Sequence, residues 1–155
     1  MRVRSIAVLL VGLFVGAPVS ATAQPLPVDW EAQLFRAREA AWRHFFSQPD
    51  KLAAMLTDDF VAIDGEETEL KRKAFVISQS REVVASGVEL RTLRFPTNIV
   101  QRYGAVAIIY TTYEYTLAVK GEVGTPRKGR ATENFVWDGT VWLHSGWHLD
   151  SVSSP

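Results

Sequence analysis

The chain has 155 residues with 17 Lys or Arg and 17 Asp or Glu, so its formal net charge at pH 7 is zero. This balance argues against a nucleic-acid partner, whose binding requires a basic face, and we expect none. The absence of Cys excludes disulfide bonds, thiolate metal sites and a lipid-bearing Cys.

Residues 1–23 have the pattern of a secretory signal peptide. Two Arg residues precede an apolar run of about 10 residues that ends at Val15, which is half the length of a membrane span. Residues 21–23, Ala-Thr-Ala, form a small-residue cleavage site. We expect residues 24–155 to remain as one periplasmic or secreted domain without membrane contact. The alternative is an uncleaved N-terminal anchor.

Amphipathic helices are predicted in the first half of this domain. Apolar residues recur at helical spacing in three segments, residues 30–47, 49–57 and about 68–86. Pro49 can begin the second helix, and Gly87 is a suitable residue just after the end of the third. Between them, residues 60–63 predict a short strand that ends in an Asp-Gly turn.

The second half has the alternation of long β-strands. Residues 88–95 and 99–103 alternate on either side of a break at Pro96, and residues 105–120 form a long β-rich segment. After a loop at 121–129, two further strands, 130–137 and 141–150, are joined by the hairpin signal Asp138-Gly139. Helices followed by antiparallel strands predict an α+β fold, with helices covering one face of a curved sheet.

This order of elements, together with particular residues, resembles the nuclear transport factor 2-like superfamily and its SnoaL-like group. The resemblance extends from Trp30 to about Val152. It is carried by Asp58-Asp59-Phe60-Val61 after the second helix, by the Asp64-Gly65 turn, and by the closing hairpin from Thr132-Glu133 through Trp137-Asp138-Gly139 to Trp142 and His148.

The resemblance implies a cone-shaped fold. A strongly curved, mainly antiparallel sheet would wrap around the first helix and enclose an apolar cavity, often in homodimers that pack sheet against sheet. Because the superfamily includes isomerases, polyketide cyclases, dehydratases, epoxide hydrolases and proteins that only bind or dimerise, the fold does not settle the function.

His148 and Asp150 are candidate catalytic residues because they share one face of the last strand, roughly 7 Å apart. A neutral imidazole could take a proton from a bound carbonyl compound while the carboxylate fixes its tautomer. The alternative is a His148 that hydrogen-bonds across the sheet and an Asp150 that caps the strand. Simple alternation would put His148 on the outer face, whereas a bulge at Gly146 would turn both residues inward. We expect the bulge.

Asp64 is a third catalytic candidate, because its place after the second helix resembles that of the catalytic base in ketosteroid isomerases. The first-helix position that supplies the donor Tyr of those enzymes here holds Trp42, and no matching acid completes an oxyanion site. The alternative is a turn residue stabilised by its own side chain.

Aromatic residues are the candidate ligand-binding groups, and the strand that carries Tyr113 predicts an inward face of alternate residues from Ala107 to Leu117. The opposite face, with Val106 and Tyr110, is apolar enough to predict a homodimer surface. The three His residues have no metal-ligand spacing, so neither metal nor cofactor is expected. The expected ligand-binding residues are Trp42, Phe45, Tyr113, Tyr115 and Trp142.

Three functions remain open from the sequence. The first is a secreted or periplasmic domain that binds a small, largely apolar molecule in an internal cavity. The second is a cofactor-independent acid–base enzyme, an isomerase, cyclase or hydrolase. The third is a non-catalytic dimeric accessory protein whose cavity is filled by its own 5 Trp, 4 Tyr and 8 Phe side chains.

Overall fold

The structure, a computed structural model, describes residues 26–65 and 68–151, so the expected signal peptide lies outside the described residues. No helix in these ranges has the length and apolar character needed to cross a membrane. The elements are, in chain order, α1 (Trp30–Phe45), α2 (Pro49–Met55), β1 (Leu56–Asp64), β2 (Lys71–Arg72), α3 (Lys73–Ala85), β3 (Val88–Tyr103), β4 (Val106–Val119), β5 (Glu122–Val123), β6 (Arg127–Trp137) and β7 (Trp142–Ser151).

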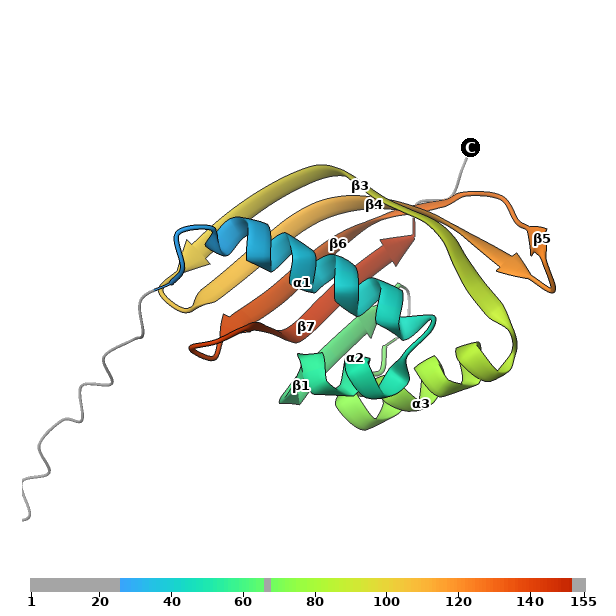
Figure 1. Cartoon of the computed structure of the whole chain (residues 1–155), viewed down its shortest axis with the longest axis horizontal. Helices are drawn as coiled ribbons and strands as arrows, with labels where there is room; N and C mark the ends of the chain where they lie inside the picture. The colour runs from blue at the N-terminus through green and yellow to red at the C-terminus, as the bar shows by residue number, and fades with distance from the viewer. Residues whose placement is uncertain (1–25, 66–67, 152–155) are drawn as a thin grey trace, which may run out of the picture.

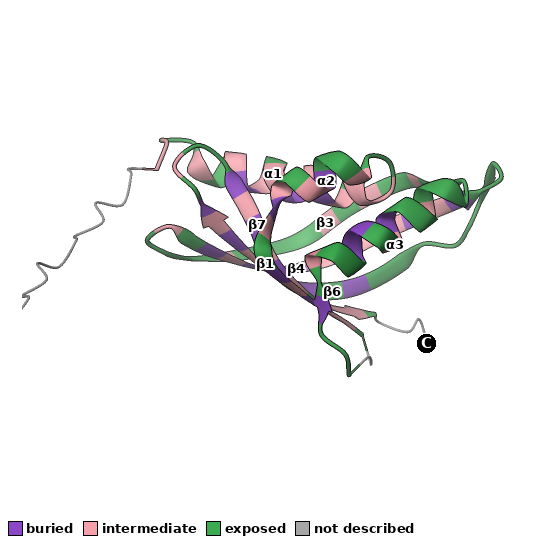
Figure 2. Cartoon of the chain, turned by 90° about the horizontal axis from the view of Figure 1, so that it is seen from below, coloured by how far each residue is buried: buried purple, intermediate pink, exposed green. Residues whose placement is uncertain are grey.

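The strands form one curved sheet in the order β2-β1-β7-β6-β4-β3, and β5 pairs with β4 beyond this path. Only β1 and β7 pair in parallel among the described strands; the other pairs are antiparallel. The helices lie across one face of the sheet (Figure 1), and none of the described helices covers the opposite face (Figure 2). The expected α+β cone is therefore confirmed.

Two groups of buried side chains hold the helices on the sheet. The first joins α1, α2 and α3 to β1, where Leu52, Phe60 and Val76 are fully buried. The second lies under the N-terminal half of α1, where Leu34 packs with residues of β4, β6 and β7. Burying a large apolar side chain contributes about 1.5–3 kcal/mol, so these two groups fix α1 at both ends.

Several element boundaries differ from the sequence expectation. β3 continues through Pro96 because it is an edge strand, where a missing N–H costs little, and its pairing with β4 shifts register between Arg94 and Thr97. β1 begins at Leu56, earlier than expected, because Leu56 already pairs with His144 of β7, ahead of the continuous pairing from Val61 to Asp64. The short strand β5 lies inside the expected loop at 121–129.

The last strand contains the expected bulge, but its faces are the reverse of the expected ones. Gly146 pairs with Asn134 and His144 pairs with Phe135, so Ser145 is the extra residue. Trp142 and His144 point inward before the bulge. The extra residue exchanges the two faces of β7, so that Trp147 points inward after the bulge. Gly is required here, because a Cβ at Gly146 would lie 2.6 Å from the carbonyl oxygen of Val61.

Candidate functional site

An internal cavity of about 210 Å³ opens between the helices and the concave face of the sheet. Its walls come from the C-terminal part of α1, from α3, and from β1, β4 and β7. Six of its lining residues are aromatic, and two titratable residues, Asp64 and His144, also border it. The aromatic lining residues are Trp42, Phe45, Phe46, Tyr113, Tyr115 and Trp147.

Stacked and tilted rings from α1 and β4 form one wall of the cavity. The ring centroids of Trp42 and Tyr113 are 5.0 Å apart, and those of Tyr113 and Tyr115 are 5.9 Å apart and stacked. The Tyr113 hydroxyl donates a hydrogen bond of 3.1 Å to the Asp150 carbonyl oxygen. Such a wall offers flat apolar surface at separations typical of favourable aromatic pairs.

Asp64 ends β1 at the cavity, and its carboxylate has two donors. Lys71 Nζ donates to Oδ2 at 3.0 Å, and the Trp147 indole N–H donates to Oδ1 at 2.7 Å. Lys71 is itself buried, with 8% of its side chain exposed. The structure thus brings Asp64 to the cavity and orients it by contacts with β2 and β7, which the interpretation as a self-stabilised turn residue did not foresee.

Three buried polar residues form an interior polar cluster next to the aromatic wall: Arg38, Glu133 and His144. The Trp42 indole N–H donates to Glu133 Oε1 at 2.9 Å, and His144 Nε2 lies 4.0 Å from the same oxygen. Glu133 Oε2 and both imidazole nitrogens are buried without a hydrogen-bond partner in the structure. Because buried polar atoms are rarely left unpaired, these atoms mark where water or a ligand group is expected.

Burial shifts the pKa values of two residues of the interior polar cluster, Glu133 and His144, in opposite senses. Desolvation raises the pKa of Glu133 to about 7, although the Trp42 hydrogen bond and the Arg38 charge both lower it. Desolvation lowers the pKa of His144 to about 3, and the Gly146 backbone opposes this only in part. His144 is therefore neutral at pH 7, with one ring nitrogen as donor and the other as acceptor.

Arg38 is held within the cone by contacts with the edge of the sheet. Its Nη1 donates to Asn98 Oδ1, and its guanidinium carbon lies 3.7 Å from the centroid of the Phe95 ring. Thr111 Oγ1 lies 3.4 Å from the same nitrogen. A cation stacked on an aromatic face with hydrogen-bond acceptors beside it tolerates burial, so Arg38 places a positive charge inside the cone.

Five residues predicted from the sequence as site residues line the cavity: Asp64, Trp42, Phe45, Tyr113 and Tyr115. Trp142 does not. Its ring packs against Trp30 and Trp137, and its indole N–H donates to the Trp30 carbonyl oxygen at 3.2 Å, so the prediction that it lines the cavity is wrong.

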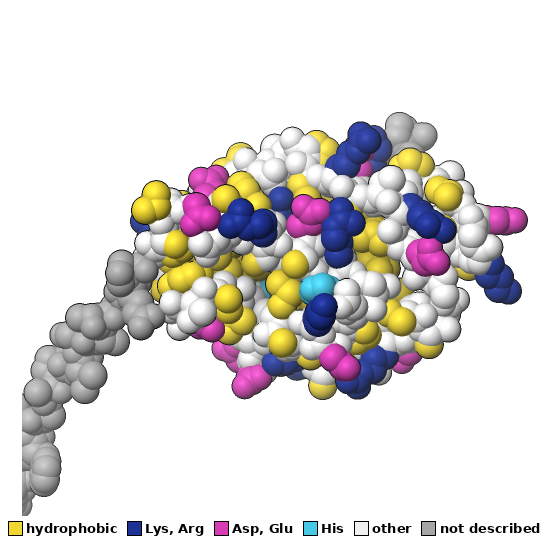
Figure 3. Space-filling view, viewed as in Figure 1, with side chains coloured by type: hydrophobic (Ala, Val, Ile, Leu, Met, Phe, Trp, Pro, Cys, Tyr) yellow, Lys and Arg dark blue, Asp and Glu magenta, His cyan; other side chains and the backbone are white. Residues whose placement is uncertain are grey.

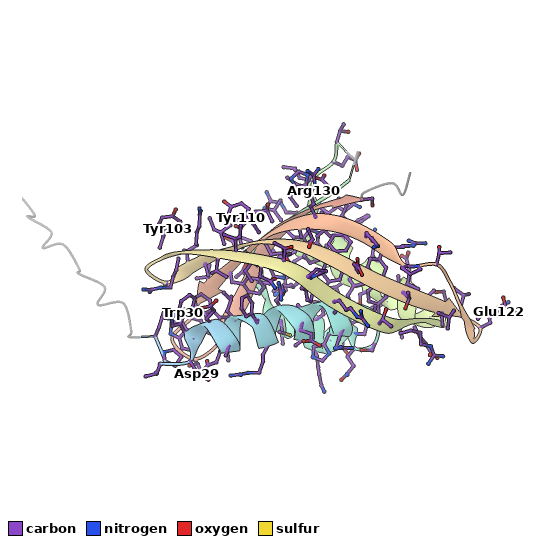
Figure 4. The ribbon with its side chains drawn as sticks, turned by 90° about the horizontal axis from the view of Figure 1, so that it is seen from above. Asp29, Trp30, Tyr103, Tyr110, Glu122 and Arg130 are labelled. Atoms are coloured by element: carbon purple, nitrogen blue, oxygen red, sulfur yellow. The ribbon has the colours of Figure 1, made fainter. Side chains whose placement is uncertain are left out.

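His148 and Asp150 lie together on the outer face of the sheet, with His148 Nε2 3.3 Å from Asp150 Oδ1. Half of the His148 side chain is exposed. The expected inward orientation of both residues is therefore wrong, because Trp142 and His144 occupy the inward positions before the bulge. Arg130, which lies 3.4 Å from Asp150, and Tyr110 project on this side, away from the helices (Figure 4).

Sequence reasoning missed Glu133 and His144. A signal for Glu133 was present, because strand alternation places it on the same face of its strand as Phe135 and Trp137, and a carboxylate among such residues is unusual. His144 was missed because we expected the opposite face of the last strand to point inward before the bulge. The residues of the interior polar cluster, Arg38, Glu133 and His144, come from three different elements, α1, β6 and β7.

Known structures with this architecture support the nuclear transport factor 2-like fold. An NTF2-like protein from Cytophaga hutchinsonii is 11% identical, with a TM-score of 0.67 over 79% of this chain and 98% of that one. A ketosteroid isomerase-like protein from Erwinia carotovora is 19% identical, with a TM-score of 0.62 over 79% of this chain and 96% of that one. A scytalone dehydratase-like protein from Novosphingobium aromaticivorans is 11% identical, with a TM-score of 0.66 over 79% and 84%.

Sequence comparison adds nothing to the structural likeness: no family model and no curated protein matches the chain. At such low identities the structural likeness establishes the fold alone. The functional argument therefore rests on the cavity, its aromatic walls and the polar groups that border it.

Proposed function

We propose that this protein, once secreted or periplasmic, binds a small, largely apolar molecule in the cavity beneath α1. The observation that carries the proposal is a hollow of about 210 Å³ with aromatic walls. An apolar cavity of roughly 150 Å³ in another protein holds benzene. A single substituted ring is therefore the size of molecule that fits here.

The open cavity favours binding over an accessory role with a filled interior. Large aromatic side chains surround the hollow and pack on one another, but they do not occupy it. On the helix side, charges of both signs are scattered among apolar groups (Figure 3). This surface shows no single-sign patch that would favour a charged macromolecule instead.

Toluene is a suitable first probe of the proposed site, with thermal unfolding as the readout. Binding at ten times the dissociation constant stabilises the folded state by about 1.4 kcal/mol. Leu149→Trp fills the cavity from β7 and should abolish this gain. Leu143→Trp, on the outer face of the same strand, should retain it. An equal toluene response in both variants contradicts the proposal.

A cofactor-independent acid–base enzyme is the second candidate. Its supporting observation is that Asp64 and His144 border the same cavity, with the buried Glu133 carboxylate next to His144. If the cavity catalyses a proton transfer, turnover should fall in Asp64→Asn and remain in His148→Ala. Loss of turnover in His148→Ala alone would move the chemistry to the outer face.

We further propose that a second copy of this chain covers the outer face of the sheet. Exposed apolar side chains of β3 and β4 lie on this face, and Ile99 pairs directly with Tyr110 across the two strands. Contiguous exposed apolar side chains on a sheet face are typical of protein–protein contact sites. The exposed apolar residues are Ile99, Tyr103, Val106 and Tyr110.

A further inference from the structure

The polar atoms bordering the cavity differ in how much hydrogen-bonding capacity they have left. Both Asp64 oxygens already accept a hydrogen bond, and the Tyr113 hydroxyl already donates one. The His144 imidazole borders the same cavity, is 99% buried, and has no well-formed hydrogen bond at either nitrogen, although the Gly146 backbone interacts with the ring. A ligand group that reaches the other ring nitrogen gains a hydrogen bond without displacing an existing one.

The position of His144 is fixed by its neighbours. Its ring stacks on Phe135 with centroids 4.2 Å apart and an interplanar angle of 9°, and Trp147 lies beside it at 5.4 Å. Since the ring cannot turn freely in this packing, its nitrogens keep their directions when a ligand enters. The imidazole is therefore a preorganised partner, and ligand binding does not have to order it.

We propose that the ligand class of this cavity is an uncharged, single-ring aromatic compound with one hydroxyl group, a simple phenol, whose hydroxyl hydrogen-bonds with His144. This inference rests on the proposed function and specifies the ligand of the same site. The ring would lie between the indole and phenol walls, which offer flat faces on α1 and β4. A hydroxyl suits an imidazole because each can both donate and accept.

Charged analogues are excluded by the electrostatics of the interior. A carboxylate would lose its hydration against a neutral imidazole and would lie near the Glu133 carboxyl group, whose Oε1 is 4.0 Å from His144 Nε2, while the Arg38 guanidinium that could offset its charge does not line the cavity. An ammonium group would also lose its hydration, and the Asp64 carboxylate that it could pair with is already held by Lys71. A phenol remains uncharged at pH 7, since phenolic groups titrate near pH 10.

The test compares p-cresol, toluene and p-toluate at pH 7 by calorimetric titration of the purified protein. These probes share one ring and one methyl group and differ in the hydroxyl and the charge. The hydrogen bond should make p-cresol bind about 5- to 10-fold more tightly than toluene. p-Toluate should bind more weakly than toluene. Equal affinities for p-cresol and toluene, or tightest binding of p-toluate, would overturn the phenol assignment.

Two variants on one strand assign the preference to His144. His144→Phe keeps a flat ring against Phe135 and should reduce the p-cresol preference to about 1-fold while toluene still binds. His148→Phe, on the outer face, should leave both affinities unchanged. A preference that persists in His144→Phe would contradict the role of the imidazole.

If His144→Phe does not fold, the nitrogen NMR signals of the His144 ring in the unmodified protein test whether the ligand hydroxyl contacts this ring. p-Cresol should shift these signals, and toluene should shift them much less; equal shifts overturn the inference. The proposed function fails separately, when neither toluene nor p-cresol binds. Toluene binding without a p-cresol preference leaves the proposed function in place and removes only the ligand class.

Discussion

At the scale of single residues, Glu133 and His144 respond to burial in opposite ways although they are neighbours. Burial favours the neutral form of each, which means a protonated carboxyl group for Glu133 and an unprotonated imidazole for His144. Both therefore make stability depend on pH, and with opposite signs. The two contributions overlap near pH 4.5–6.5, so each is isolated by comparing the unmodified protein with a variant that lacks that titratable group.

Glu133→Gln tests the carboxyl contribution. The unfolded chain releases this proton near pH 4.5 and the folded chain near pH 7, so the folded state binds more protons between these values. The unfolding free energy of the unmodified protein therefore loses about 3 kcal/mol from Glu133 as pH rises through this window. Denaturant unfolding should show Glu133→Gln gaining on the unmodified protein by up to that amount. A constant difference across pH 4.5–7.5 would contradict the buried carboxyl group.

His144→Phe should show the opposite slope. Below pH 6.5 the unfolded chain protonates this ring, while the folded chain resists protonation down to about pH 3. The unmodified protein therefore loses about 1.4 kcal/mol for each pH unit below 6.5 from this residue, and the variant does not. The same unfolding series should show His144→Phe gaining on the unmodified protein as pH falls. A gain as pH rises would mean that the imidazole is not buried in its neutral form.

Part of the candidate site, the cavity under α1, could be predicted from the sequence. Asp64 was identified because its place after the second helix resembles that of the catalytic base in ketosteroid isomerases, and the ring residues of α1 and β4 were identified from helical and strand periodicity. His144 was not, because one extra residue at Ser145 changes which side chains of β7 share a face, and the sequence does not specify which half of the strand points inward. The packing of Trp142 against Trp30 settles that choice, and such a contact between distant residues is not visible in local periodicity.

At the scale of elements, the close pairing of β6 with its neighbours shapes the cavity wall. A Cβ at Gly129 would overlap both the Tyr113 ring and the Asp150 carbonyl oxygen. Only Gly leaves room there for the ring and for the hydrogen bond that its hydroxyl donates to Asp150. The backbone of β6 thereby determines where an aromatic wall residue of β4 lies.

Gly129→Ala should therefore destabilise the fold and disturb the wall together. Relieving the overlap requires the Tyr113 ring and the backbone of β7 to move, at a cost of about 1–3 kcal/mol. Thermal unfolding should show this loss, and toluene binding should weaken. Gly124→Ala is the matched control, because its Cβ would have only an ordinary 3.4 Å contact. Comparable losses in both variants would mean that Gly129 has no special role.

Element order was largely predictable, whereas element limits were not. Segregated helical and alternating patterns were sufficient for the α+β architecture. The continuation of β3 through Pro96 depends on its place at the sheet edge, and the early start of β1 depends on its pairing with β7. Both are properties of the assembled sheet, so local propensity could not reveal them.

At the scale of the whole molecule, the layered arrangement leaves one sheet face to water or to a partner. If a second copy covers it, Ile99→Asp places a charge opposite Tyr110 in the interface and should produce a monomer. Val84→Glu, an exposed position on α3, should leave the oligomer unchanged. Sedimentation equilibrium measures both. A monomeric unmodified protein, or a dimer in Ile99→Asp, would contradict the proposed interface.

The central claim is that the cavity under α1 is a ligand-binding site, and the most direct measurement is the location of bound toluene by intermolecular nuclear Overhauser effects. We expect contacts from the toluene protons to the rings of Trp42, Tyr115 and Trp147, which line the cavity. Contacts confined to Tyr110 and other side chains of the outer face, with none to these three rings, would contradict the claim.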